Sequence, residues 1–107
     1  MFTRVVEVTS KAGKARELTR TVNERVLPIL KNQPGFLDEI TLVSDEDPNR
    51  LLAISFWKSK EHAETYQREQ YNKVTEIISN FLEGTPQVRT FEVEQSTVHK
   101  IASGRAA

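Results

Sequence analysis

Three side chains that can donate, accept or move protons recur at helical spacing in the second half of the chain: His62, Tyr66 and Gln70. Residues four apart lie on the same face of an α-helix, so an imidazole, a phenol and an amide are expected to project together. Histidine titrates near neutral pH, which makes His62 the natural candidate for a general base. Together the three groups can orient a phenolic substrate and assist proton transfer, with Tyr66 and His62 as the catalytic candidates.

Each of these residues also has a purely structural interpretation. Tyr66 can be a core aromatic whose hydroxyl lies at the rim of the core, and His62 falls in the first helical turn, where side chains are often exposed. Gln70 either borders a polar cavity or reaches the surface at a helix bend. Convergence of all three on a cavity of a few hundred Å³, the size typical of ligand sites, would favour the catalytic interpretation, whereas a fully packed Tyr66 without such a cavity would argue against an enzyme.

Two further residues are candidates for substrate binding. Trp57, the only tryptophan, ends a predicted strand and forms either a pocket wall or the packing that holds a helix against the sheet. Arg4 lies in the first predicted strand, on the same face as its apolar neighbours two and four residues away. It either reaches an anionic ligand, pairs with a carboxylate such as Asp38, or extends its charged end to solvent.

Composition excludes several classes of function. Lys plus Arg equals Asp plus Glu, at 15 each, so there is no electrostatic reason to expect nucleic acid or an anionic membrane as a partner. The chain has no cysteine, which excludes thiolate metal sites and a cysteine nucleophile. We expect no metal site and no cofactor, because the acidic run 45–47 lacks the spacing of a calcium loop. No apolar segment approaches the roughly 18 residues of a membrane span, and the N-terminus lacks a signal-peptide pattern, so a cytoplasmic protein is expected.

Hydrophobic periodicity predicts six elements in the order βαββαβ, which is a ferredoxin-like α+β fold with an antiparallel four-stranded sheet. Gly84-Thr85-Pro86 is expected to stop the second helix, and Pro28 to cause a kink or an irregular last turn in the first. The predicted strands are 2–8, 36–43, 51–58 and 87–95, and the predicted helices are 14–31 and 60–83. One domain is expected over residues 1–95, followed by a tail, 96–107, that is either flexible or an arm lying on a partner subunit.

Both faces of the predicted central hairpin carry apolar side chains. One set is Phe36, Ile40, Leu42, Leu52, Ile54 and Phe56; the other is Leu37, Val43, Leu51, Ala53 and Trp57. The two helices can cover only one face of the sheet. Stacking two sheets face to face would cover the other, so the pattern favours a homodimer.

Several short motifs follow one another along the chain: Lys11-Ala12-Gly13-Lys14, Pro34-Gly35-Phe36, Asp47-Pro48 and Phe56-Trp57-Lys58-Ser59. Their order and spacing resemble the antibiotic biosynthesis monooxygenase family, whose members are dimeric α+β barrels. The resemblance covers about residues 2–95.

The resemblance implies a cofactor-independent monooxygenase acting on a small aromatic or quinol-like metabolite. Such an enzyme needs to deprotonate its substrate, since the resulting carbanion can pass an electron to dioxygen. Tyr66 occupies the position that resembles the family's active-site aromatic. Tyr71 and Asn72 resemble the aromatic and amide side chains that antibiotic-forming members place along the same helix. The alternative is a non-catalytic dimer that binds a small hydrophobic ligand; the sequence names no substrate or pathway.

Haem degradation, known in another branch of the family, can be tested residue by residue. Those members carry an asparagine in the first strand, a tryptophan nine residues after the strand tryptophan, and a haem-ligating histidine ten residues further on. Counted from Gly13 and Trp57, the matching residues here are Val6, Tyr66 and Glu76. All three depart from that pattern, and glutamate is not among the usual axial ligands of haem iron. The sequence therefore argues against haem chemistry of this type.

Overall fold

A computed structural model describes residues 1–101 of the 107-residue chain. Its elements follow the predicted βαββαβ order, with each helical segment divided into shorter pieces. In chain order they are β1 (Phe2–Ser10), α1 (Ala15–Thr21), η1 (Val22–Val26), α2 (Leu27–Lys31), β2 (Phe36–Val43), β3 (Arg50–Trp57), α3 (Lys60–Glu69), α4 (Tyr71–Ile78), η2 (Ser79–Phe81) and β4 (Leu82–Glu92).

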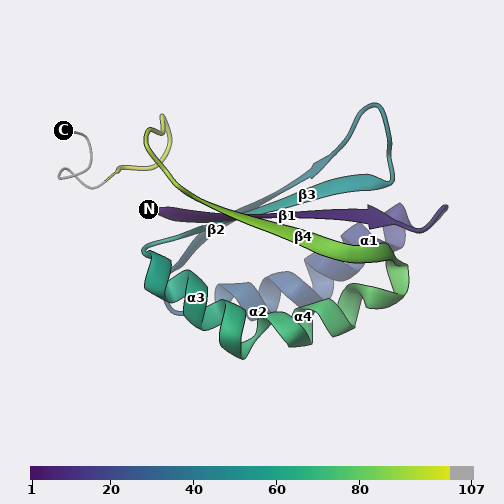
Figure 1. The fold of residues 1–107 in the computed structure, drawn as a ribbon, viewed down its shortest axis with the longest axis horizontal. Coiled ribbons are helices and arrows are strands. Elements are labelled where there is room, and N and C mark those ends of the chain that lie inside the picture. Colours follow the sequence, from purple (N-terminus) through teal and green to yellow (C-terminus); the bar gives the residue numbers. More distant parts are fainter. Residues whose placement is uncertain (102–107) are drawn as a thin grey trace.

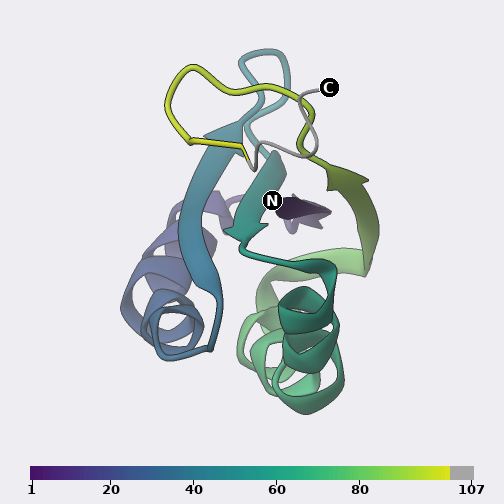
Figure 2. The same cartoon turned by 90° about the vertical axis from the view of Figure 1, so that its left-hand side faces the viewer.

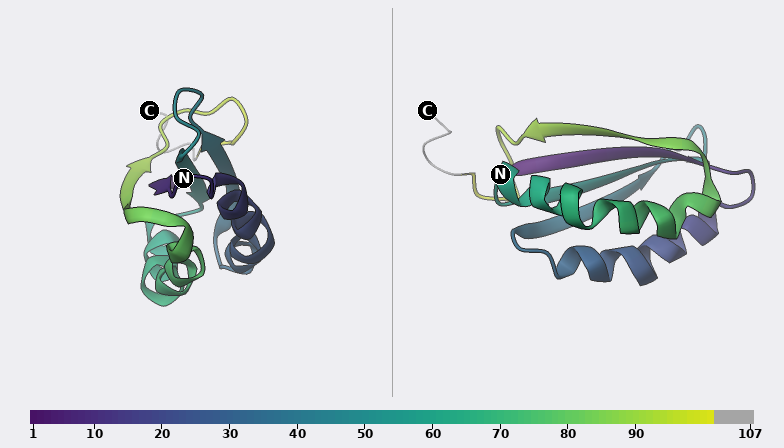
Figure 3. Two further views of the ribbon diagram at one scale, coloured as in Figure 1. Left: turned by 90° about the vertical axis from the view of Figure 1, so that its right-hand side faces the viewer. Right: turned by 60° about the horizontal axis from the view of Figure 1, so that its bottom comes forward.

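The four strands form one antiparallel sheet in the order β2-β3-β1-β4. Both helical segments lie side by side along one face of this sheet, which we call the inner face (Figures 1 and 2). The opposite, outer face carries no helix in the described part of the chain (Figure 3). This is the ferredoxin-like α+β fold that the hydrophobic pattern predicts.

Strand positions agree closely with the prediction, except at the start of β4. Strand 36–43 is confirmed, and β1 and β3 differ from the predicted strands by at most two residues at either end. Gly84-Thr85-Pro86, predicted to end a helix, instead lies inside β4, where Gly84 adopts a φ of 71° and the register with β1 shifts. Proline is tolerated here because β4 is an edge strand with one unpaired side.

The structure divides each of the two predicted helices into shorter pieces. The first contains a five-residue π-helical segment, Val22–Val26, directly before α2, which has proline in its first turn. Proline lacks an N–H and cannot complete the ordinary ladder, so the irregular hydrogen bonding falls upstream of Pro28 and not in the last turn. The second helix is interrupted at Gln70, whose φ of −124° lies outside the helical range, and restarts at Tyr71.

A β-bulge decides which residues of β2 face the helices. Phe36 pairs with Trp57, but the next pair is Asp38 with Phe56, so Leu37 is an extra residue. Directly paired residues share a face of a sheet. Phe36 therefore lies on the inner face, whereas the predicted partners Ile40 and Leu42 lie on the outer face; this corrects the predicted grouping.

Two hydrogen bonds fix the junction between β3 and α3. Ser59 caps the helix by accepting a hydrogen bond from the backbone N–H of His62 (3.3 Å). The Lys58 N–H donates to the carbonyl of Gly35 at 2.8 Å. Gly35 has a φ of 80°, a left-handed conformation that favours glycine. A side chain at this position would also overlap the His62 ring.

After β4 the chain turns back over the outer face. His99 lies 3.5 Å from a carboxylate oxygen of Asp38, measured from its Nε2 atom, and its ring centroid lies 5.4 Å from that of Phe56. The described end of the chain thus contacts its own sheet through His99. The remainder of the predicted tail lies outside the described residues.

Candidate functional site

A cavity of about 70 Å³ lies between the inner face of the sheet and the helices. Its lining is mostly aliphatic, with a few polar side chains from β1, β2, β3, α3 and α4. The lining residues are Arg4, Val6, Val8, Leu18, Val22, Val26, Leu30, Glu39, Thr41, Leu51, Leu52, Ala53, Ser55, Tyr66, Tyr71, Val74 and Ile78.

Arg4 brings a buried positive charge to this cavity. Its side chain is only 3% exposed, and its guanidinium carbon lies 5.0 Å from the ring centroid of Tyr66 and 4.7 Å from that of Tyr71. The guanidinium donates a hydrogen bond to Oε1 of Gln67. Within residues 1–101 no carboxylate forms an ion pair with it. The predicted partner Asp38 lies on the outer face and contacts His99 instead.

A buried cation without a carboxylate is unusual, because charges removed from water are normally paired. Burial lowers the pKa of Arg4, while the two tyrosines beside it oppose that effect. Arginine stays protonated at neutral pH even so. Two aromatic faces stabilise a cation only in part. The site is therefore electrostatically suited to receive a negative charge.

Tyr66 lies deep in the site and is positioned by Trp57. The two rings are stacked with their centroids 5.1 Å apart, and Tyr66 is 3% exposed. Trp57 is fully buried and donates from its indole nitrogen to Oγ of Ser55 at 2.9 Å. It is not among the residues that line the cavity. Burial raises the pKa of Tyr66 to about 12, so its hydroxyl is protonated at neutral pH.

Tyr71 supplies a second phenol, from the first turn of α4. Its hydroxyl is buried and has no hydrogen-bond partner among the described residues. Buried polar groups are normally hydrogen-bonded, so an orphan hydroxyl at a cavity wall is available to a ligand. Burial also raises the pKa of Tyr71, against the opposing charge of Arg4.

Glu39 is a lining residue that the sequence analysis missed. Its Oε2 atom accepts a hydrogen bond from Oγ1 of Thr41 at 2.8 Å, and burial raises the pKa of its carboxyl group. Counting alternate residues from Phe36 placed Glu39 on the face opposite Phe36. The bulge at Leu37 brings the two onto the same face.

Four predicted site residues do not line the cavity: Trp57, His62, Gln70 and Asn72. His62 is hydrogen-bonded to Ser59, at 2.8 Å from its Nδ1 to the hydroxyl oxygen, and its ring lies against Gly35. Gln70 occupies the break between α3 and α4, and Asn72 is exposed on α4. The predicted convergence of Tyr66, His62 and Gln70 therefore does not occur. The cavity is also smaller than expected.

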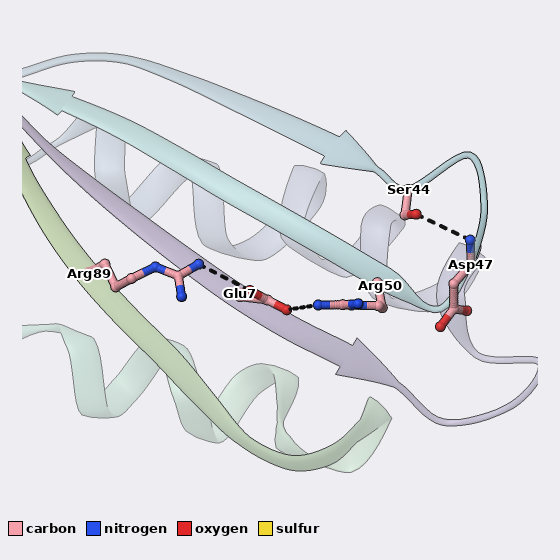
Figure 4. A network of polar contacts seen from close by, with 5 residues as sticks. All are labelled: Glu7, Ser44, Asp47, Arg50 and Arg89. Atoms are coloured by element: carbon pink, nitrogen blue, oxygen red, sulfur yellow. Dashed lines mark hydrogen bonds and ion pairs between the residues drawn. The ribbon is translucent and has the colours of Figure 1, made fainter.

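The outer face carries a separate polar network. Glu7 lies between Arg50 and Arg89, with oxygen–nitrogen distances of 2.5 and 3.1 Å (Figure 4). Hydrogen bonds from Arg50 and Arg89 lower the pKa of Glu7. Exposed apolar side chains accompany this network on the same face: Ile40, Leu42 and Phe91. A hollow of about 400 Å³, lined partly by Glu7, Leu42 and Arg50, opens beside them.

The described residues contain neither a metal-binding cluster nor a helix that could span a membrane. Residues 1–101 contain no group of three or more His, Cys, Asp or Glu side chains placed to hold a metal ion. None of the helices there is both long and apolar enough to cross a membrane.

The fold and the cavity between its helices and sheet define a known class of small α+β protein. The chain belongs to the antibiotic biosynthesis monooxygenase family, whose family model matches residues 1–77. A comparison with curated proteins found no match.

Solved structures with the same fold come from diverse organisms. SnoaB, a cofactor-independent oxygenase from Streptomyces nogalater, crystallised as the mutant N63A, is 18% identical with a TM-score of 0.77, over 92% of this chain and 97% of that one. The Streptomyces coelicolor monooxygenase from the gene ActVA-Orf6, solved with the ligand nanaomycin D, is 17% identical with a TM-score of 0.77 over 92% of each chain. A conserved protein from Methanosarcina mazei is 18% identical with a TM-score of 0.70, over 85% and 91%.

Proposed function

We propose that this protein is a cofactor-independent monooxygenase that oxidises a small aromatic or quinol-like metabolite. The observation that carries the proposal is the buried Arg4 guanidinium, which forms no ion pair with a carboxylate among the described residues and lines a mostly aliphatic cavity. Family membership supports the type of reaction. The name of SnoaB describes a cofactor-independent oxygenase of the same fold.

The proposed role of Arg4 is to stabilise a phenolate or enolate. Charge interactions are stronger in a buried site than in water, so a fixed guanidinium favours loss of the substrate's phenolic proton. The resulting anion can transfer an electron to dioxygen without a metal or flavin. The substrate supplies the electrons: a CH₂ group and O₂ become a carbonyl group and water, with one oxygen atom in each product.

The two tyrosines have a different proposed role. Tyr66 and Tyr71 are protonated at neutral pH, because burial raises the pKa of both hydroxyls. They can therefore donate hydrogen bonds to a substrate oxygen but not act as bases. Trp57 holds Tyr66 in place through the ring stack. His62, Gln70 and Asn72 lie off the cavity and have no part in this proposal.

Cavity size favours a compact ligand. The volume of about 70 Å³ is well below the roughly 300–1,000 Å³ of common ligand sites. A fused-ring substrate requires the helices to move away from the sheet. The π-helical segment Val22–Val26, two of whose residues line the cavity, is the place where such movement is expected, since π-segments are frequent at functional sites.

We also propose that two copies pair through their outer sheet faces. Ile40, Leu42 and Phe91 are 44%, 45% and 50% exposed on the single chain, and packing sheet against sheet would bury them. The second copy is the occupant that the sequence pattern favours. In this arrangement each subunit keeps its own cavity on the far side of the interface.

Oxygen consumption with a panel of phenols and quinols tests the proposed activity. We expect turnover by the unmodified protein without added metal or flavin, and a marked loss in Arg4→Met and Tyr66→Phe. The matched control Arg16→Met removes an exposed arginine from α1 and should keep full activity. Saturable binding of the same compounds without oxygen uptake would instead identify a non-catalytic ligand-binding protein.

A further inference from the structure

Three aligned residues cross the sheet beneath the cavity. Arg4 on β1 pairs with Ser55 on β3, and Ser55 pairs with Glu39 on β2. All three line the cavity. Neighbouring strands lie about 4.8 Å apart, so the backbones of Arg4 and Glu39 are about 10 Å apart. The two charged side chains therefore line the cavity from strands on opposite sides of Ser55.

The cavity offers one group able to accept a proton. Its titratable lining residues are Arg4, Glu39, Tyr66 and Tyr71. Arg4 is already protonated, and both tyrosines keep their protons at neutral pH. His62, the base expected from the sequence, is directed to Ser59 and Gly35 instead. This leaves the carboxyl group of Glu39.

We propose that Glu39 is the general base of this site and removes the phenolic proton of a substrate whose negative charge is then held at Arg4. This inference rests on the proposed function. In the step, the substrate O–H bond breaks, an O–H bond forms on the Glu39 carboxylate, and the electron pair stays on the substrate oxygen and spreads into the ring. No electron is transferred at this stage.

Local geometry supports this assignment. Thr41 donates to Oε2 of Glu39, which fixes the carboxylate and leaves Oε1 without a hydrogen bond from the described residues. Partial burial raises the pKa of Glu39, which makes its carboxylate a stronger base than an exposed one. Thr41 is the one exposed residue among those that line the cavity. The Glu39 end is therefore the end through which a proton can return to solvent.

Hydrogen exchange without oxygen reports on the anion that this step forms, because deuterium adds to a ring carbon of the phenolate. Phloroglucinol is a single-ring phenol whose ring hydrogens exchange with deuterium oxide through its keto tautomer: a C–H bond breaks, a C–D bond forms, and D₂O becomes HDO. We expect the protein to accelerate this exchange under argon, measured by NMR. The acceleration by Glu39→Gln should be about 100-fold smaller than that by the unmodified protein, which is the lower end of the usual contribution of general acid–base catalysis.

Controls separate chemistry from folding. Glu46→Gln makes the same change at an exposed loop position and should exchange like the unmodified protein. Glu39→Asp keeps a carboxylate and should retain part of the acceleration. Circular dichroism verifies that each variant is folded. Equal exchange by Glu39→Gln and the unmodified protein, or no acceleration by the unmodified protein, would overturn the inference.

The same samples exposed to air distinguish this inference from the proposed function. Exchange that depends on Glu39 but is not accompanied by oxygen uptake would support the base and reject the oxygenase. Oxygen uptake that Glu39→Gln retains in full would support the oxygenase and reject Glu39 as its base.

Discussion

Trp57 and Tyr66, nine residues apart in the chain, stack with their ring centroids 5.1 Å apart and their planes inclined by 30°. One ends a strand and the other lies in the second turn of the following helix. The stack fixes how α3 sits on the sheet, and with it the position of Tyr66 at the cavity.

Truncating Trp57 should therefore damage both stability and the site. We expect Trp57→Ala to lower the free energy of unfolding by about 3–5 kcal/mol, the usual cost of removing a large buried aromatic side chain. Urea denaturation measures this. Trp57→Phe keeps an aromatic ring and should cost less. Equal costs for the two variants would show that the stack with Tyr66 is unimportant.

Replacing Arg4 should separate stability from ligand binding. Burying a charge without a paired opposite charge costs free energy, so Arg4→Met should unfold at the same temperature or higher. Binding of 4-nitrophenolate, followed by its visible absorbance, should weaken about tenfold or more, because hydrogen bonds to charged groups contribute about 1.5–3 kcal/mol. Arg16→Met is the control. Strong destabilisation of Arg4→Met would mean that the guanidinium serves the fold.

Glu39 should make stability depend on pH. Because burial raises its pKa above the ordinary value of 4.5, the folded protein holds this proton more tightly than the unfolded chain. Its contribution is therefore most favourable below about pH 4.5 and is lost as the pH rises through the folded-state pKa. We expect Glu39→Gln to be more stable than the unmodified protein at pH 7, and this gain to disappear at low pH. Thermal unfolding at several pH values tests the sign.

Gly35 and Gly13 form a matched pair for testing close contacts. Both have a positive φ, 80° and 78°, but a methyl group at Gly35 would meet the His62 ring, whereas one at Gly13 would meet nothing within 4 Å. Gly13→Ala should cost only the backbone strain, about 1–2 kcal/mol. Gly35→Ala should cost more in urea denaturation. Adding His62→Ala to Gly35→Ala should recover part of the extra loss of stability. If nothing is recovered, the contact with His62 is not the cause of that loss.

The apolar outer face predicts a change of assembly on substitution. Light scattering should give the mass of two chains for the unmodified protein and of one chain for Ile40→Asp, because a charge would be buried in the interface. Glu64→Lys changes a charge on the exposed side of α3 and should leave the dimer intact. A single-chain mass for the unmodified protein would refute the proposed pairing.

Local patterns in the sequence predicted the element order and most strands, but they could not place the cavity. The helical spacing of His62, Tyr66 and Gln70 is present in the structure, yet only Tyr66 reaches the cavity. The His62 ring is instead hydrogen-bonded to the capping Ser59 and lies against Gly35. The helix break at Gln70 changes the helical phase of α4, so Tyr71 occupies the cavity wall instead. These effects depend on a local capping contact, on the contact of His62 with the distant Gly35, and on a backbone irregularity that side-chain periodicity does not report.

The extra residue at Leu37 has a consequence for how the chain can diverge. Phe36 and Asp38 pair with consecutive residues of β3, so a related chain that lacked Leu37 would keep Glu39 on the inner face and Ile40 on the outer face. Loss of this one residue would therefore preserve both the site and the surface proposed for pairing. Loss of a residue further along β2, with the bulge retained, would instead exchange the two sides of the residues that follow it. Alignments of related chains that ignore this insertion compare residues from opposite sides of the sheet.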